Sequence, residues 1–225
     1  MPLTYAVPSW FFGADIFLEM IFALATFIVA YYSYKIYKLS GQEQSRLLTT
    51  SFIFIGISYF IKALINFTSI GSVKEVVREA TFTNLHTVGL LASYVHLLFF
   101  ITGLVTFAYM TFGIKSLRVY ALLLATNLLI IFFGYDINDK ILIFNLLASL
   151  LTLYISSHYF IEYSRNNNQR TFLLFLAFSA LFFSGVSYVF ARSITINYVL
   201  GHVLEFCSYA LILTSLALTI NKKRK

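Results

Sequence analysis

Long apolar runs separated by short polar segments dominate the chain. Seven of them are about long enough to cross a bilayer, because a helix needs roughly 20 mostly apolar residues to span the hydrocarbon core. The runs do not alternate apolar with polar residues as barrel strands do, so they predict helices. We therefore expect an all-α integral membrane protein, one seven-transmembrane-helix bundle over residues 1–225. The predicted spans are about 10–34, 47–68, 86–112, 117–134, 141–163, 171–191 and 197–220.

Basic residues gather on one side of the predicted membrane. The first, third and fifth loops and the tail carry eleven lysines and arginines, whereas the opposite loops carry four. Because cytoplasmic loops are enriched in these residues, we expect the N-terminus outside and the C-terminus in the cytoplasm of a plasma-membrane protein. The eleven are Lys35, Lys38, Arg46, Lys115, Arg118, Arg165, Arg170, Lys222, Lys223, Arg224 and Lys225, and the four are Lys74, Arg78, Lys140 and Arg192.

Composition agrees with a membrane protein and removes other classes. The chain is 60% hydrophobic and 11% charged, whereas soluble domains carry about 25% charged residues. The net charge of +7 reflects the loop asymmetry, so we expect the lipid bilayer and not nucleic acid as its partner. The single cysteine, Cys207, excludes an internal disulfide and cysteine-based metal motifs. No phosphate loop, zinc-protease motif or serine elbow is present, which disfavours an enzyme.

A short motif recurs in the second and sixth runs. Gly56-Ile57-Ser58-Tyr59 matches Gly185-Val186-Ser187-Tyr188, and Tyr34 matches Tyr163 at the same spacing. The match predicts a 3+1+3 architecture, in which helices 1–3 and 5–7 are parallel repeats joined by the fourth helix. Chance recurrence of common residues is the alternative.

No family is assigned from these features. Sugar transporters of the SWEET type have the 3+1+3 arrangement, but their helices contain prolines, and Pro2 and Pro8 here precede the first span. Microbial rhodopsins hold retinal on a lysine of the seventh helix, and residues 198–220 contain none.

Six ionisable residues of the first, second, third and seventh predicted spans fall into two layers in the outer half of the membrane, where such groups are costly and mark functional sites. Three are expected roughly 7–8 Å below the outer surface, namely Asp15, Lys62 and His202. The other three, Glu19, His96 and Glu205, are expected roughly 12–14 Å down. The matching depths predict one ligand- or ion-binding site in the outer half of the bundle.

Charge balance limits what this site does. Three carboxylates face a single lysine, Lys62, for which the depths predict Asp15 as the partner. The remaining negative charge must be offset by a bound proton, a protonated histidine or a bound cation. We expect a receptor- or transporter-like protein whose outward pocket binds a cation, a proton or a small polar ligand. If it signals, the basic loops must contact a cytoplasmic or membrane partner protein.

Two alternatives stay open. In the first, the buried charges only lock the bundle, and the chain is a structural or interaction subunit of a membrane complex. In the second, the chain is a membrane redox protein or enzyme. A haem would then lie between His96 and His202, or a metal would be held by residues from the set His96, Glu19, Glu205 and His202. The cofactor itself is not identified by the sequence.

Overall fold

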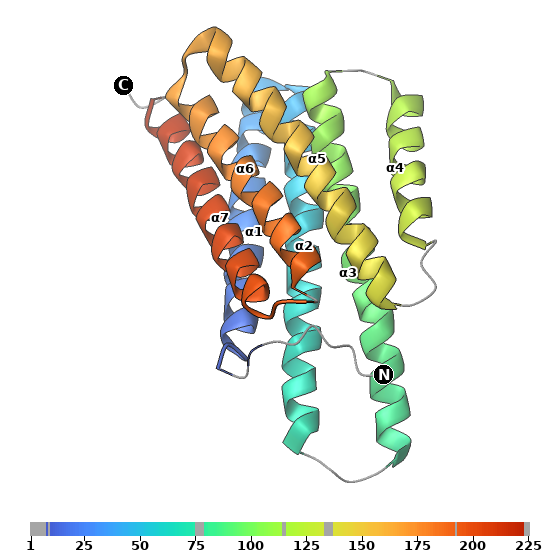
Figure 1. Ribbon diagram of the computed structural model, residues 1–225. Helices are drawn as coiled ribbons and strands as arrows, with labels where there is room; N and C mark the ends of the chain where they lie inside the picture. Colours follow the sequence, from blue (N-terminus) through green and yellow to red (C-terminus); the bar gives the residue numbers. More distant parts are fainter. Residues whose placement is uncertain are drawn as a thin grey trace.

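Seven helices make up the described part of the chain (Figure 1). The computed structural model describes residues 8, 10–74, 79–113, 116–132, 137–191 and 193–222, with side chains except at 68–90, 130–138 and 220–222. The helices are α1 (Ala14–Ser40), α2 (Glu43–Lys74), α3 (Glu79–Phe112), α4 (Leu117–Phe132), α5 (Ile137–Asn166), α6 (Gln169–Phe190) and α7 (Ile196–Lys222). The described residues form no strand, as the apolar pattern predicts.

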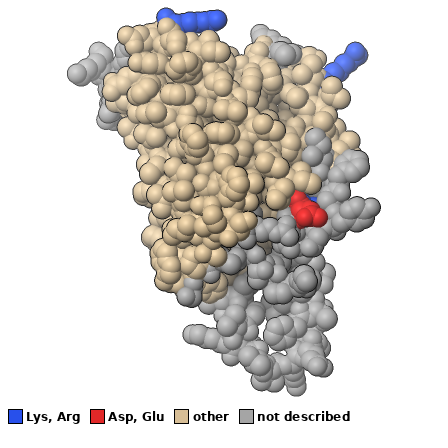
Figure 2. All heavy atoms as spheres, in the orientation of Figure 1, with Lys and Arg blue, Asp and Glu red and all other residues tan. Residues whose placement is uncertain are grey.

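Six of these helices are long and apolar enough to cross a bilayer, which confirms a multi-pass membrane protein. The fourth is shorter: α4 has 16 residues, so it is about 24 Å long, against about 30 Å of hydrocarbon. Large apolar side chains such as Phe17, Leu24 and Leu150 are exposed on the outer surface, where lipid can cover them. On the face drawn in Figure 2, lysines and arginines stand out at the upper rim, and uncharged residues cover most of the described surface.

Apart from α4, which ends within its predicted run, the helices extend beyond the predicted apolar runs at one end or both. The first run ends near residue 34, but α1 continues to Ser40 because its last residues, including Lys35 and Lys38, still favour a helix. It stops at Gly41, whose left-handed backbone (φ 67°) lets its N–H donate to Tyr37 O. Hydrophobicity therefore locates the membrane crossing, whereas capping decides where the helix ends.

Six helices close into a ring in the order α1–α2–α3–α5–α6–α7, and α7 returns to contact α1. The remaining helix, α4, lies outside this ring and contacts α3 and α5 (Figure 1). The odd-numbered helices α1, α3, α5 and α7 all run in the same direction. We call the end of the bundle where α1 begins the Asp15 end, and the end where α1 stops the Ser40 end.

Small residues allow close packing within the ring. A Cβ on Gly103 of α3 would lie 2.9 Å from the backbone oxygen of Ser51 in α2. A Cβ on Gly185 of α6 would overlap the hydroxyl of Ser149 in α5. Close approach of this kind replaces hydrophobic association between helices in lipid. It brings the polar faces of neighbouring helices together inside the ring.

Aromatic rings fill the interior towards the Ser40 end. Phe107 of α3 lies 4.8 Å from Phe178 of α6 between ring centroids, and Phe112 stacks on Tyr154 of α5 at 4.6 Å. These contacts join α3 to α5 and α6 without ionisable groups. The ionisable side chains of the interior lie instead towards the Asp15 end.

Candidate functional site

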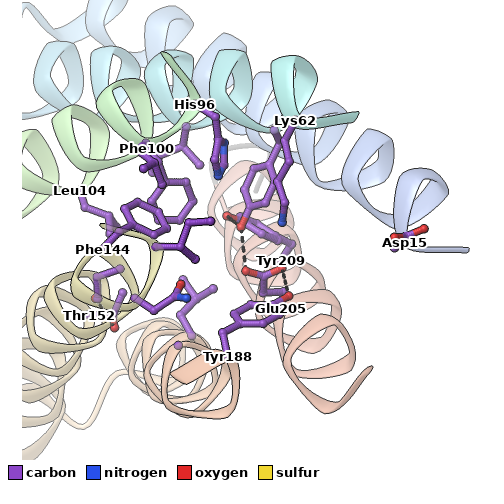
Figure 3. A pocket seen from close by; sticks show the side chains of 18 of the residues that line it. Asp15, Lys62, His96, Phe100, Leu104, Phe144, Thr152, Tyr188, Glu205 and Tyr209 are labelled. Carbon is purple, nitrogen blue, oxygen red and sulfur yellow. Dashed lines mark hydrogen bonds between the residues drawn. The ribbon is translucent and has the colours of Figure 1, made fainter. Parts of the chain in front are cut away.

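A cavity of about 570 Å³ occupies the interior of the ring. All six ring helices line it and α4 contributes no lining residue among the described part of the chain. Its two halves differ in chemistry (Figure 3): Asp15, Lys62 and Glu205 lie at one side, and Phe100 and Phe144 at the other. Its volume falls within the roughly 300–1,000 Å³ of small-molecule sites.

Four of the six predicted site residues line this cavity, namely Asp15, Lys62, His96 and Glu205. The other two lie directly behind the wall. Glu19 contacts Lys62, and His202 contacts Glu205. The structure thus brings all six into one region, contributed by α1, α2, α3 and α7.

Lys62 forms its ion pair with Glu19, not with Asp15 as the depths predicted. Lys62 Nζ lies 3.1 Å from Glu19 Oε1. Asn66 donates to both oxygens of the same carboxylate, at 3.0 and 2.8 Å. The prediction was wrong because Glu19 lies one helical turn, about 6 Å, from Asp15, and the lysine side chain spans that distance. Glu19 is fully buried, and its charge is balanced within the bundle.

Asp15 has a different set of partners, at the start of α1. Its Oδ1 accepts from the backbone N–H groups of Gly13 at 2.8 Å and Ile16 at 2.9 Å. Its Oδ2 accepts from Tyr198 Oη of α7 at 3.4 Å. Negative charge in the first turn of a helix is stabilised by the free N–H groups there. Asp15 therefore holds the backbone at the start of α1 and ties it to α7.

Glu205 is held between two tyrosines from opposite sides of the ring. Tyr59 of α2 donates to Oε1 at 3.1 Å, and Tyr188 of α6 donates to Oε2 at 2.9 Å (Figure 3). Tyr209 of α7 donates in turn to Tyr59 Oη at 3.2 Å. The carboxylate is buried, and both of its oxygens accept hydrogen bonds from neutral groups. This arrangement positions a carboxylate at the cavity wall without neutralising it.

His96 joins α3 to α2. Its Nδ1 lies 2.6 Å from Ser58 Oγ, and the same hydroxyl donates to His96 O at 2.9 Å. The ring also contacts Phe100 and Phe144 in the apolar half of the cavity. His96 thus lies at the border between the two halves.

His202 is enclosed by aromatic rings. Its ring packs against Phe11, Phe22, Tyr188 and Tyr198, with centroid distances between 4.7 and 6.2 Å. Neither ring nitrogen has a hydrogen-bond partner within the described residues. Nδ1 lies 3.7 Å from Glu205 Oε2, beyond hydrogen-bond distance. Burial among aromatic rings favours the neutral form of the imidazole, so His202 does not offset the Glu205 charge.

The three carboxylates differ in how far their partners balance the negative charge. Glu19 has a lysine, and Asp15 has two helix-start N–H groups. Glu205 has tyrosine hydroxyls, and within the described residues His202 is the one ionisable base within 4 Å of it. Glu205 thus has neither an ion pair with lysine or arginine nor helix-start N–H groups, and Lys62 acts on it only from beyond ion-pair distance.

The metal and haem alternatives gain no geometric support. Among the described residues, no three histidine, cysteine or acidic side chains are grouped so that they could hold a metal ion. His96 lines the cavity whereas His202 does not, so the two rings do not face each other across it. The metal candidates Glu19 and Glu205 have lysine and tyrosine partners instead.

Sequence reasoning missed the tyrosines that hold Glu205. Tyr59 and Tyr188 are the last residues of the recurring Gly-x-Ser-Tyr motif, which was the available signal. The motif suggested a repeat, but one sequence does not show that both copies turn their tyrosines to the same carboxylate. Asn66 lies one turn after Lys62 on the same face of α2, and its bonds to Glu19 follow from that position.

Comparison of the chain with protein-family models, with curated proteins and with solved structures finds no match.

Proposed function

We propose that this multi-pass membrane protein is receptor- or transporter-like and binds a cation or a proton at Glu205. The observation that carries the proposal is the pair of hydrogen bonds from Tyr59 and Tyr188, which hold a buried carboxylate at the cavity wall with no lysine or arginine partner among the described residues. A buried charge without an ion-pair partner costs several kcal/mol of stability, about as much as removing one partner of a buried ion pair. A bound cation, or a proton on the carboxyl group, removes this cost.

The cavity is proposed to open to the outside. Its charged half lies towards the Asp15 end, while the described basic side chains Lys35, Lys38 and Arg165 belong to the Ser40 end. The positive-inside rule supports a cytoplasmic Ser40 end in the plasma membrane. A signalling partner would then contact the basic loops at that end.

The fourth helix and the repeat belong to the same proposal. In this proposal α4 is a short seventh span. Helices α1–α3 then form one three-helix unit and α5–α7 a second, and corresponding helices of the two units run in the same direction. Supporting this, Gly56 packs α2 against α1, and Gly185 packs α6 against α5. Tyr59 and Tyr188, from corresponding helices, then bind the same carboxylate from either unit.

A second candidate is a purely structural role, as a subunit of a membrane complex. The Lys62–Glu19–Asn66 cluster favours it, because each charge there already has a partner and needs no ligand. A structural role does not account for the buried Glu205 carboxylate, which has no lysine or arginine partner among the described residues. The two proposals therefore predict different results for a substitution of Glu205.

Thermal unfolding of the purified protein tests the choice. Melting is followed across pH and in sodium, potassium or ammonium chloride, with N-methylglucamine keeping the ionic strength constant. We expect the parent to depend on pH or on one cation, Glu205→Gln to lose that dependence, and Glu19→Gln to retain it at lower stability. Glu162→Gln, at a half-buried carboxylate of α5 that lies outside the cavity lining, is the control. A Glu205→Gln protein that melts and responds like the parent would establish the structural role.

A further inference from the structure

We propose that the cavity takes an amphipathic organic monoammonium ion, with its charged head beside Glu205 and a hydrocarbon or aromatic body in the apolar half. This inference rests on the proposed function, since it names the class of ligand for the same cavity. It replaces the small polar ligand expected from the sequence by a molecule with two chemically distinct ends.

The apolar half is built by side chains that offer a ligand little beyond packing. Phe100 and Leu104 of α3 lie on the same side of the cavity as Phe144 of α5 (Figure 3). Ala148 of α5 also lines the cavity, and all four residues belong to the hydrophobic core. Two polar side chains of α5 also line the cavity, but Thr152 donates to Ala148 O at 2.8 Å within its own helix, and Asn145 already has a partner. Water gains few hydrogen bonds against such walls, so an apolar body is the better occupant.

The charged half selects a positive head. The cavity region contains Asp15, Glu19 and Glu205 against one lysine, Lys62. Around Glu205, the rings of Tyr59 and Tyr188 form aromatic walls, and aromatic faces attract ammonium groups. Lys62 Nζ itself lies 5.8 Å from the centre of the Tyr188 ring, so a cation already occupies one such face.

The position of Lys62 also limits the ligand to one charge. Its ammonium group lines the same half of the cavity as Glu205. A second positive charge on the ligand would be repelled by Lys62, whereas a single head can be placed on the Glu205 side. A diamine or polyamine is therefore disfavoured relative to a monoamine.

The contact between Phe107 and Phe178 bounds the apolar half towards the Ser40 end. Because the Phe107–Phe178 contact closes this end of the cavity of about 570 Å³, the hydrocarbon chain of a ligand there is limited in length. Two sources of ammonium amphiphile differ in this respect: a short amine that enters from water, and a long-chain amine that enters from the bilayer.

Thermal stabilisation of the protein in nanodiscs of neutral lipid tests the class. The probes are methylammonium, octylammonium and octadecylammonium, with octanoate and octanol matched to octylammonium in chain length. We expect octylammonium to bind more tightly than methylammonium, by up to about 4-fold for each methylene buried, the equivalent of about 0.8 kcal/mol per methylene. Stronger stabilisation by octylammonium or octadecylammonium than by methylammonium supports the ligand class. A larger effect of octylammonium identifies a short amine that enters from water, and a larger effect of octadecylammonium identifies a long-chain amine that enters from the bilayer.

Two variants locate the chain within the cavity. Ala148→Leu fills part of the apolar half, and Leu150→Phe changes an exposed position of the same helix as the control. We expect the ratio of octylammonium to methylammonium affinity to fall at least 5-fold in Ala148→Leu and to stay unchanged in Leu150→Phe. An unchanged ratio in Ala148→Leu would overturn the placement of the chain.

The outcomes separate this inference from the proposed function. If methylammonium and octylammonium stabilise the parent equally, and both effects vanish in Glu205→Gln, the cation site stands and the amphipathic ligand is overturned. Octanoate or octanol acting as strongly as octylammonium would likewise overturn it. If pH and every cation leave the melting temperature unchanged, the proposed function fails as well.

Discussion

Lys62 Nζ lies 3.1 Å from Glu19 Oε1, and this pair joins α1 to α2 inside the bundle. The glutamate is fully buried, while the lysine keeps part of its side chain in contact with the cavity. One carboxylate of the interior is therefore neutralised by the chain itself. The remaining negative charge belongs to residues that touch the cavity directly.

The first prediction concerns this pair. Lys62→Met leaves Glu19 charged and buried, so it should lower the free energy of unfolding by roughly 3–5 kcal/mol. Lys62→Met with Glu19→Gln should cost less than the sum of the two single changes. The measurement is reversible unfolding in mixed micelles. Lys62→Met with Asp15→Asn is the control and should be additive, and additivity in the Glu19 cycle would show that the pair is not formed.

The second prediction concerns the tyrosines that hold Glu205. A hydrogen bond to a charged group contributes about 1.5–3 kcal/mol, so Tyr188→Phe should lower the unfolding free energy by that amount. Tyr59→Phe should cost more, because Tyr209 Oη also loses its acceptor. Tyr154→Phe, at a stacked tyrosine of α5, should change stability by less than about 0.5 kcal/mol. Equal stability of all three variants would show that the tyrosine hydroxyls do not hold the carboxylate.

The third prediction concerns helix packing at Gly185. Gly185→Ala should lower stability by about 1–3 kcal/mol, because the new methyl group overlaps Ser149 Oγ. Ser149→Ala removes that oxygen and should restore most of the loss in the double variant. At Gly103 the obstacle includes the backbone oxygen of Ser51, so no side-chain truncation there should rescue Gly103→Ala fully. Rescue is measured as the non-additive part of the double-variant unfolding free energy.

The fourth prediction concerns orientation. In a Cys207→Ser background, which removes the single native thiol, a cysteine at Asp139 should react with a membrane-impermeant maleimide added to intact cells. A cysteine at Arg165 should react only after permeabilisation. Both positions are exposed in the structure, so access to the thiol depends on the side of the membrane. The reverse labelling pattern would place the cavity towards the cytoplasm.

Hydropathy and residue depth predicted the helical class and the set of side chains near the cavity, because both depend on position along one helix. The partner of Lys62 was not predictable in this way. Asp15 and Glu19 share one face of α1 a single turn apart, and the reach of the lysine decides between them. The tyrosine bonds to Glu205 depend on how α2, α6 and α7 rotate about their axes. That rotation is set by packing between helices and is not encoded in the period of any one of them.

The position of α4 outside the ring affects the direction in which the later helices run. Three consecutive helices leave the chain on the opposite side of the bundle, so a second three-helix unit joined by a loop alone would be inverted relative to the first. By crossing back outside the ring, α4 lets α5 run in the same direction as α1 and α3 (Figure 1). No described residue of α4 lines the cavity, yet with α4 in place α6, which carries Tyr188 to Glu205, runs in the same direction as α2. A helix outside the cavity thereby fixes the direction of the helices that follow it along the chain.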